Sequence, residues 1–190
     1  WLPYVTWHYL EMTGDRSVLD EERAFLEAPI LTPEQHDAYL HPVKSVDEVV
    51  INAAKYPAKA VVITGGEPSM YNLDYLSSQF IAHGIRLYIE TSGAYRVTGH
   101  WHWICLSPKK TAPPKAGVYD KAHELKVIVH NLSDLKWAEE HAIKVNSNCR
   151  LFLQPEWSKR EDIMPIIVNY VMDNPKWNIS LQTHKYLKIP

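Results

Sequence analysis

The nonapeptide Ala60-Val61-Val62-Ile63-Thr64-Gly65-Gly66-Glu67-Pro68 carries the most information about the fold. Its first four residues are apolar and mostly β-branched, which indicates a buried strand. The glycine pair lets the backbone turn and approach a ligand, because no Cβ stands in the way. Backbone carbonyls at this turn, with the Glu67 carboxylate, are suited to receive an ammonium group. The alternative is a tight turn without a ligand; a phosphate-binding loop is excluded because no Gly-Lys-Ser/Thr follows.

Short apolar runs alternate with longer amphipathic segments from residue 60 onward. The runs that we expect to be strands are 60–64, 86–91, 103–107, 124–129, 150–154 and 178–182. The segments 73–83, 133–145 and 161–172 carry apolar residues at helical spacing. Strand–helix alternation of this kind predicts an α/β fold with a parallel sheet.

Polar residues end most of the expected strands. They are Thr64, Glu90 with Thr91, Ser107, Gln154, and Gln182 with Thr183. Because a parallel sheet collects its ligands at the carboxyl ends of its strands, these side chains predict one shared site. The alternative is that strands simply end where polar loops begin.

Composition limits the class of protein. The 190 residues suffice for one domain with a sizeable core, and 46% apolar residues argue against disorder. A formal charge of −2 without a basic run gives no sign of a nucleic-acid partner. No apolar stretch is long enough for a membrane span, and the two cysteines are too few for a disulfide framework, so we expect a cytoplasmic setting. The chain begins with Trp1 rather than Met, as a fragment or a processed chain would.

Residues 1–44 differ from the rest of the chain. The segments expected to be helical are 4–12 and 17–26. Ser45, followed three residues later by Glu48, has the pattern of a helix capping box. We place a junction near residues 42–45, which separates a helical segment from an α/β domain over 45–190.

Several motifs follow the Gly-Gly-Glu-Pro string in a fixed order. They are Ile-Glu-Thr-Ser-Gly at 89–93, Leu-Ser-Pro-Lys-Lys at 106–110, Glu-Leu-Lys-Val-Ile at 124–128, Leu-Gln-Pro-Glu at 153–156 and Ser-Leu-Gln-Thr-His-Lys at 180–185. Over residues 45–190 the chain thereby resembles the 7-carboxy-7-deazaguanine synthases, a family of radical S-adenosylmethionine (SAM) enzymes. The resemblance implies an open, mostly parallel partial barrel of about six strands, preceded here by the short helical segment.

The same resemblance implies an activity and its cofactors. The family converts 6-carboxytetrahydropterin to 7-carboxy-7-deazaguanine, with loss of ammonia, in queuosine and deazapurine biosynthesis. SAM, a 4Fe-4S cluster and magnesium take part. The implied partner is the small-molecule pterin, with no nucleic acid and no membrane, and a homodimer is left open.

Roles for individual residues also follow from the resemblance. The expected SAM-binding residues are Gly65, Gly66, Glu67, Ser107, Pro108 and Lys109, with Gln154, Pro155, Glu156 and Trp157 around the adenosine. The expected substrate contacts are Thr64 and Pro190, and the expected catalytic side chains are Glu90, Gln182 and His184. Three alternatives stay open. In these alternatives, Glu90 is a strand-end carboxylate paired with a lysine, His184 is a surface histidine, and Pro190 belongs to a frayed terminus.

The thiolates that such an enzyme needs are missing. A radical SAM enzyme holds three irons of its cluster with three closely spaced Cys residues, and the fourth iron binds SAM. Here Cys105 and Cys149 lie 44 positions apart, and no cysteine precedes them. We interpret both as structural and expect no metal ligands. The His100-Trp101-His102 stretch reads as the entry to a strand.

The first 44 residues do not replace the missing part. Their motifs are Trp-Leu-Pro-Tyr-Val at 1–5, Glu-Met-Thr-Gly-Asp at 11–15, Val-Leu-Asp-Glu at 18–21 and Phe-Leu-Glu at 25–27. These resemble a helical-barrel segment of the cellobiose and chitobiose phosphorylases, which implies a chimera. The alternative is a divergent N-terminus of a synthase.

Three hypotheses of function remain. The first is a 7-carboxy-7-deazaguanine synthase that is inactive as this chain. The second is a catalytically dead SAM- or pterin-binding domain, which the cysteine count favours for this polypeptide alone. The third is a fragment of a carbohydrate phosphorylase, against which the α/β majority argues.

Overall fold

Six parallel strands form one sheet in the computed structural model, which describes residues 46–187. The strands are β1 (Ala60–Ile63), β2 (Arg86–Thr91), β3 (Trp103–Leu106), β4 (Glu124–Val129), β5 (Arg150–Pro155) and β6 (Trp177–Ile179). They lie side by side in sequence order, β1-β2-β3-β4-β5-β6, and every neighbouring pair is parallel. The predicted open, parallel α/β sheet is confirmed. The helices expected at 4–12 and 17–26 and the Ser45 cap lie outside the described residues.

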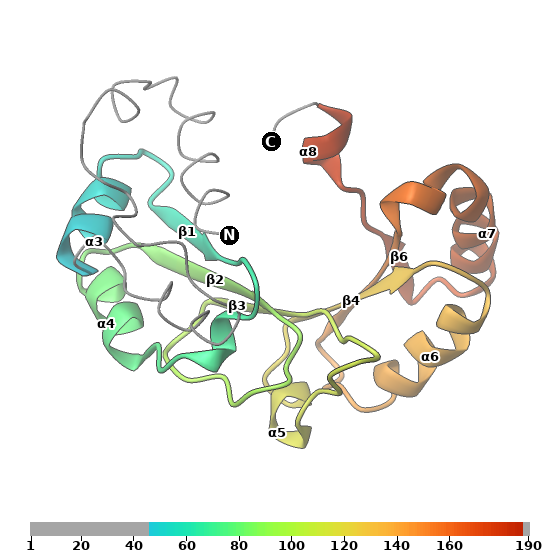
Figure 1. Cartoon of the computed structure of the whole chain (residues 1–190), viewed down its shortest axis with the longest axis horizontal. Coiled ribbons are helices and arrows are strands. Elements are labelled where there is room, and N and C mark those ends of the chain that lie inside the picture. The colour runs from blue at the N-terminus through green and yellow to red at the C-terminus, as the bar shows by residue number, and fades with distance from the viewer. Residues whose placement is uncertain (1–45, 188–190) are drawn as a thin grey trace, which may run out of the picture.

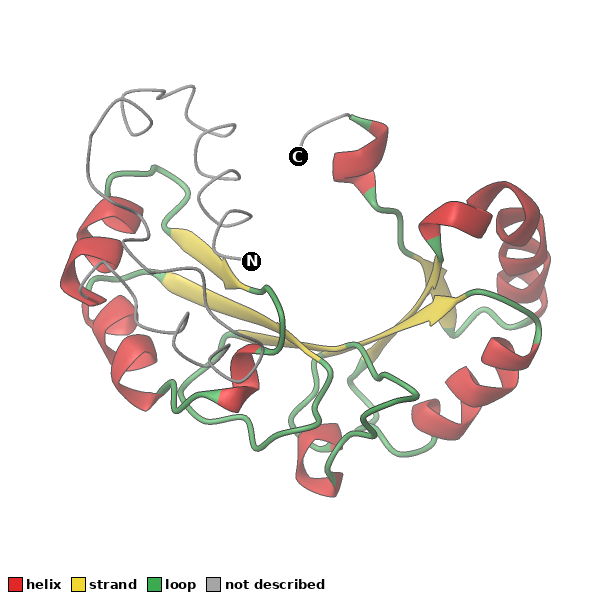
Figure 2. Ribbon diagram, viewed as in Figure 1, coloured by secondary structure: helices red, strands yellow, loops and turns green. Residues whose placement is uncertain are grey.

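Helices and short helical turns precede β1, follow β6 and join most of the successive strands. They are α3 (Val46–Ala54), η2 (Pro68–Met70), α4 (Asp74–Ala82), α5 (Ala116–Tyr119), α6 (Ser133–Ala142), η3 (Trp157–Lys159), α7 (Arg160–Asp173) and α8 (Thr183–Tyr186). Figure 1 shows the sheet bent into an arch, with α3 to α7 along its convex side. None of the helices α3 to α7 covers the concave side, as the colouring by secondary structure also shows (Figure 2). None of the helices in residues 46–187 has the length and apolar character needed to cross a bilayer.

Successive side chains of each strand point to opposite faces of the sheet, so the two faces carry different kinds of residue. On β4, Leu125, Val127 and Val129 are fully buried under the helices. Glu124 and Lys126, which alternate with them, point to the concave side, because neighbouring residues of a strand face opposite ways. The core therefore lies between the sheet and its helices, and the concave face is free for chemistry.

The chain after β6 departs from the expected strand at 178–182. The strand ends at Ile179, although the N–H of Ser180 still donates to the carbonyl of Leu153 at 2.9 Å. Gln182 then forms the N-cap of α8. This early end turns the chain toward the carboxyl edge of the sheet instead of extending the strand.

Candidate active site

The loop after β1 presents bare backbone at the carboxyl edge of the sheet. Gly65 has φ +105°, a conformation that favours glycine, and a Cβ built on Gly65 or Gly66 would meet no atom within 4 Å. The space around the pair is therefore open to a ligand. Thr64 is half-buried just before it. This geometry fits the predicted approach of SAM to the backbone of the turn, which stays a prediction.

The carboxylate of Glu67 is engaged inside the protein. One oxygen accepts hydrogen bonds from the N–H and hydroxyl of Ser69, at 3.1 and 2.6 Å, and from the Thr91 hydroxyl at 2.5 Å. The other oxygen accepts from the N–H of Ser92 at 2.7 Å and from its hydroxyl. Burial alone would raise the pKa of Glu67, but these donors lower it below its ordinary value. The carboxylate thus ties the Gly-Gly loop to the end of β2, which leaves the backbone carbonyls as the groups suited to an ammonium.

Ser107, Pro108 and Lys109 follow β3, and the Lys109 ammonium lies 3.3 Å from the hydroxyl of Ser107. The Lys109 side chain reaches solvent, yet partial desolvation and the neighbouring Lys126 lower its pKa. The Glu67 and Glu90 carboxylates partly oppose that effect. These charges lie close enough to act on one another, so the structure brings the ends of β1, β2 and β3 into one polar neighbourhood.

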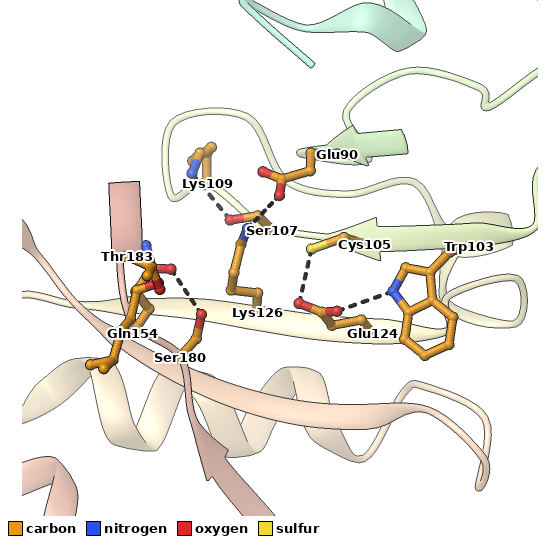
Figure 3. Close-up of polar contacts among 11 residues, drawn as sticks. Glu90, Trp103, Cys105, Ser107, Lys109, Glu124, Lys126, Gln154, Ser180 and Thr183 are labelled. Atoms are coloured by element: carbon orange, nitrogen blue, oxygen red, sulfur yellow. Dashed lines mark hydrogen bonds and ion pairs between the residues drawn. The ribbon is translucent and has the colours of Figure 1, made fainter. Parts of the chain in front are cut away.

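Glu90 makes an ion pair that crosses the concave face. Its Oε1 lies 2.9 Å from the Nζ of Lys126 on β4 (Figure 3). The alternative interpretation of Glu90, a carboxylate paired with a lysine, therefore holds for one of its two oxygens. Among residues 46–187 no hydrogen bond is found to the other oxygen, so a ligand-binding role for Glu90 is compatible with the pair.

The end of β5 is linked to the segment after β6. The hydroxyl of Ser180 donates to Oε1 of the buried Gln154 at 3.0 Å (Figure 3). Pro155 lies beside Val129 in the sheet, and Glu156 caps η3 by accepting from the N–H of Ser158 at 2.9 Å. Hydrogen bonds from Ser158 hold the pKa of Glu156 below its ordinary value. Pro155 and Glu156 thus fix the course of the chain from β5 into η3.

Trp157 contacts the C-terminal helix. The Arg160 guanidinium lies 4.3 Å from the centre of its ring, the Lys185 ammonium lies 5.1 Å away, and Tyr186 packs edge-on at 5.1 Å. These contacts are cation–π and aromatic interactions. They hold α8 next to the loop expected to surround adenosine.

Gln182 is the best sign of a ligand on the side of α8. Among the described residues, its Oε1 is a buried side-chain atom without a hydrogen-bond partner. Such an orphaned acceptor is unusual in a native protein and is suited to a ligand N–H. His184 lies in α8 and is half-buried. Pro190 lies outside the described residues.

The described residues offer no cluster ligands. Within 46–187 no group of three or more His, Cys, Asp or Glu is placed to hold a metal. Burial raises the pKa of the Cys105 thiol strongly and that of the Cys149 thiol to about 11, so both are poor sources of thiolate. His102, at the entry to β3, accepts the N–H of Leu87 on its Nδ1 at 3.0 Å.

Sequence reasoning placed Thr91 among the polar strand ends but missed Lys126, Ser92 and Ser180 as members of the site. Lys126 was visible as a lysine in the middle of an apolar strand, where lysine is unfavourable without a specific role. The hydroxyl residues lacked such a signal, because their partners lie far away in the sequence.

An open parallel α/β sheet with a bare glycine turn and polar strand ends defines the chain as a partial-barrel α/β protein, a class whose ligands gather at the carboxyl edge of the sheet. No protein-family model matches the chain. The 7-carboxy-7-deazaguanine synthase of Flavobacterium psychrophilum is 56% identical over 157 residues, which cover 83% of this chain and 74% of that protein. The synthase of a Synechocystis species is 44% identical over 157 residues, or 83% and 73% of the two chains. The chain belongs to the 7-carboxy-7-deazaguanine synthase family.

A solved structure agrees with this assignment. The crystal structure of QueE from Escherichia coli superposes with a TM-score of 0.65 at 26% identity, over 73% of this chain and 64% of that one. The resemblance stated from the motifs is thereby confirmed. Because residues 45–190 make up 146 of the 190 residues and the match takes in 83% of the chain, the family relation begins before residue 45. A foreign origin for the remaining N-terminal residues stays a prediction.

Proposed function

We propose that this chain provides the SAM- and pterin-binding body of a 7-carboxy-7-deazaguanine synthase. The observation that carries the proposal is the open Gly65-Gly66 backbone, which lies in one polar neighbourhood with the ends of β2 and β3. Family membership gives the reaction that such a site performs, the conversion of 6-carboxytetrahydropterin to 7-carboxy-7-deazaguanine.

The residues present fit SAM. The turn offers backbone carbonyls to the methionine ammonium, because a ligand can approach without meeting a Cβ. Ser107 and Lys109 supply a hydroxyl and a cation on the loop after β3, and Gln154 and Trp157 border the place proposed for the adenosine. When bound, SAM would supply the radical chemistry by which this family abstracts a substrate hydrogen.

The residues present do not fit the cluster itself. The sequence contains two cysteines, whereas such a cluster needs three thiolates. Within 46–187 there is likewise no group of candidate ligands for magnesium, so the expectation of magnesium rests on the family alone. The proposal for this polypeptide is therefore confined to binding and orienting SAM and the pterin.

Acceptors at the carboxyl edge suit the pterin. A tetrahydropterin presents several N–H donors along its ring. The second oxygen of Glu90 and the orphaned Oε1 of Gln182 are acceptors without a described partner, and Thr64 adds a hydroxyl. His184 and the terminal Pro190 complete the proposed set from the C-terminal end of the chain.

A catalytically inactive SAM- or pterin-binding domain is the second candidate. The cysteine count favours it for these 190 residues, and it shares the binding site described above. The carbohydrate-phosphorylase hypothesis does not fit the described α/β domain or its family.

Binding of SAM tests the proposal. Equilibrium dialysis with labelled SAM should show saturable binding to the parent chain and at least tenfold weaker binding to Gly66→Val, about 1.4 kcal/mol. A side chain at Gly66 has room in the fold, so the variant should stay folded. Gly117→Val is the matched control, because Gly117 on α5 also has open space around it and lies outside the site. Absence of saturable SAM binding by the parent, or equal affinity in Gly66→Val, would contradict the proposal.

A further inference from the structure

Lys126 occupies an unusual place for a lysine. It lies in the middle of β4, between Leu125 and Val127, which are fully buried. Its own side chain points to the concave side and is only 13% exposed. A lysine is rarely buried to this degree unless it has a partner, because its ammonium loses hydration. The position therefore indicates a specific contact.

The partner of Lys126 lies two strands away. Its ammonium reaches Glu90 on β2 at 2.9 Å, although β3 runs between the two strands. Adjacent strands are separated by about 4.8 Å, so the lysine stem must span most of two strand spacings. Cys105 is the residue of β3 that pairs with Glu90, and its small side chain lies beside that of Lys126 (Figure 3).

The other charged groups near Lys126 either accept hydrogen bonds from other residues or carry the same charge as Lys126. Glu124 accepts from the indole N–H of Trp103 at 3.0 Å and from the thiol of Cys105 at 3.4 Å. Lys109 carries a like charge. Burial alone would lower the pKa of Lys126, but its neighbours, first Cys105 and then Glu90, raise it. Glu90 is therefore the anion that the ammonium holds.

Stability is a weak reason for such a pair. The Glu90 side chain is 44% exposed, and ion pairs with one such exposed member contribute little to folding. Orientation is a stronger reason, because the contact fixes one oxygen of Glu90 and leaves the other without a partner among residues 46–187. We propose that Lys126 is a positioning residue, which holds the Glu90 carboxylate so that its second oxygen accepts N–H donors of the pterin. This inference rests on the proposed function.

The test compares three variants with the parent chain. Lys126→Met keeps the length of the stem and removes the charge, Lys126→Arg keeps the charge, and Glu90→Gln removes the anion. The affinity for 6-carboxytetrahydropterin is measured by anaerobic calorimetry, with SAM affinity and thermal unfolding as controls. We expect Lys126→Met to weaken pterin binding at least tenfold while SAM affinity changes less than threefold. Lys126→Arg should stay within threefold of the parent.

A double substitution separates positioning from an independent role. In the Glu90→Gln background, Lys126→Met should weaken pterin binding less than twofold further, because its effect acts through Glu90. Parent-like pterin affinity in Lys126→Met, or an undiminished effect in the Glu90→Gln background, would overturn the inference.

Failure of the proposed function gives a different result. A parent chain that binds no pterin refutes the pterin site and the pterin-binding part of this inference. The contact itself is then decided by ¹³C NMR of the glutamate carboxyl groups. The Glu90 resonance should move in Lys126→Met, and an unmoved resonance would show that the pair does not form in solution.

Discussion

The backbone N–H of Ser92 donates to the carboxylate of Glu67 at 2.7 Å, although 25 positions separate the two residues. This bond joins the glycine loop after β1 to the end of β2. Since both loops border the proposed SAM site, the position of the Gly65-Gly66 backbone depends on a side chain that need not touch SAM.

Replacing Glu67 tests that dependence. In Glu67→Gln one acceptor oxygen becomes an amide NH₂ that faces hydroxyl and N–H donors, so at least one hydrogen bond is lost. We expect the free energy of unfolding to fall by about 1–3 kcal/mol and SAM affinity to fall at least tenfold. Urea unfolding and dialysis measure the two effects. Unchanged SAM affinity in a destabilised variant would limit Glu67 to a role in folding.

The pH dependence of stability gives a second test of Glu67. Its pKa is lowered in the folded protein, so its contribution is complete above the unfolded pKa near 4.5 and is lost as the pH falls through the folded pKa. The stability difference between the parent and Glu67→Gln should therefore shrink as the pH is lowered below that value. A difference that is constant or grows toward acid pH would contradict this assignment.

Gly93 and Gly84 form a matched pair for a packing prediction. Both have positive φ, +74° and +69°. A Cβ on Gly93 would lie 2.7 Å from Leu106 Cδ1 and 2.9 Å from Val118 Cγ1, whereas one on Gly84 would meet nothing. We expect Gly84→Ala to cost about 1–2 kcal/mol from the backbone alone, and Gly93→Ala about 2–4 kcal/mol. Chemical denaturation measures both values, and equal costs would show that the packing around Gly93 yields easily.

Glu139 joins three elements on the convex side. Its carboxylate accepts from the Tyr170 hydroxyl at 2.7 Å, from the Trp177 indole at 2.8 Å and from the Lys176 ammonium at 2.5 Å. Desolvation, together with the Glu139 carboxylate, raises the pKa of Tyr170 to about 12. Glu139→Gln should lower that pKa toward the ordinary value, as ultraviolet titration of tyrosinate would show. Glu139→Ala should also cost about 2–3 kcal/mol, because the buried indole N–H loses its acceptor. A Tyr170 titration that does not move would contradict the contact.

Iron–sulfur reconstitution tests the missing thiolates. Anaerobic treatment of this chain with iron and sulfide should give no stoichiometric four-iron cluster, because it has two cysteines and both have raised pKa values. Absorption and electron paramagnetic resonance spectra measure the outcome, with Cys105→Ser/Cys149→Ser as a blank for adventitious iron. A cluster that cleaves SAM on reduction would show that other ligands replace the cysteines.

The sequence by itself determined the order of strands and helices and the family. Apolar runs such as 124–129 identify strands because burial on the helix-covered face demands them, whereas the predicted burial of 60–64 is wrong, since no residue of β1 is buried and Val62 is 55% exposed. The Gly-Gly turn is a local property of its residues. It also determined that the chain cannot supply three thiolates, since a count of cysteines needs no coordinates.

Only the tertiary structure decided what the charged residues do. The SAM-binding role expected of Glu67 stays a prediction, and the structure adds that donors from Ser69, Thr91 and Ser92 engage both of its oxygens. Lys126 showed no partner in the sequence, because its anion is 36 positions earlier and two strands away. Periodicity reports which face a residue lies on, whereas partners across a sheet depend on strand order and curvature, which only the assembled sheet fixes.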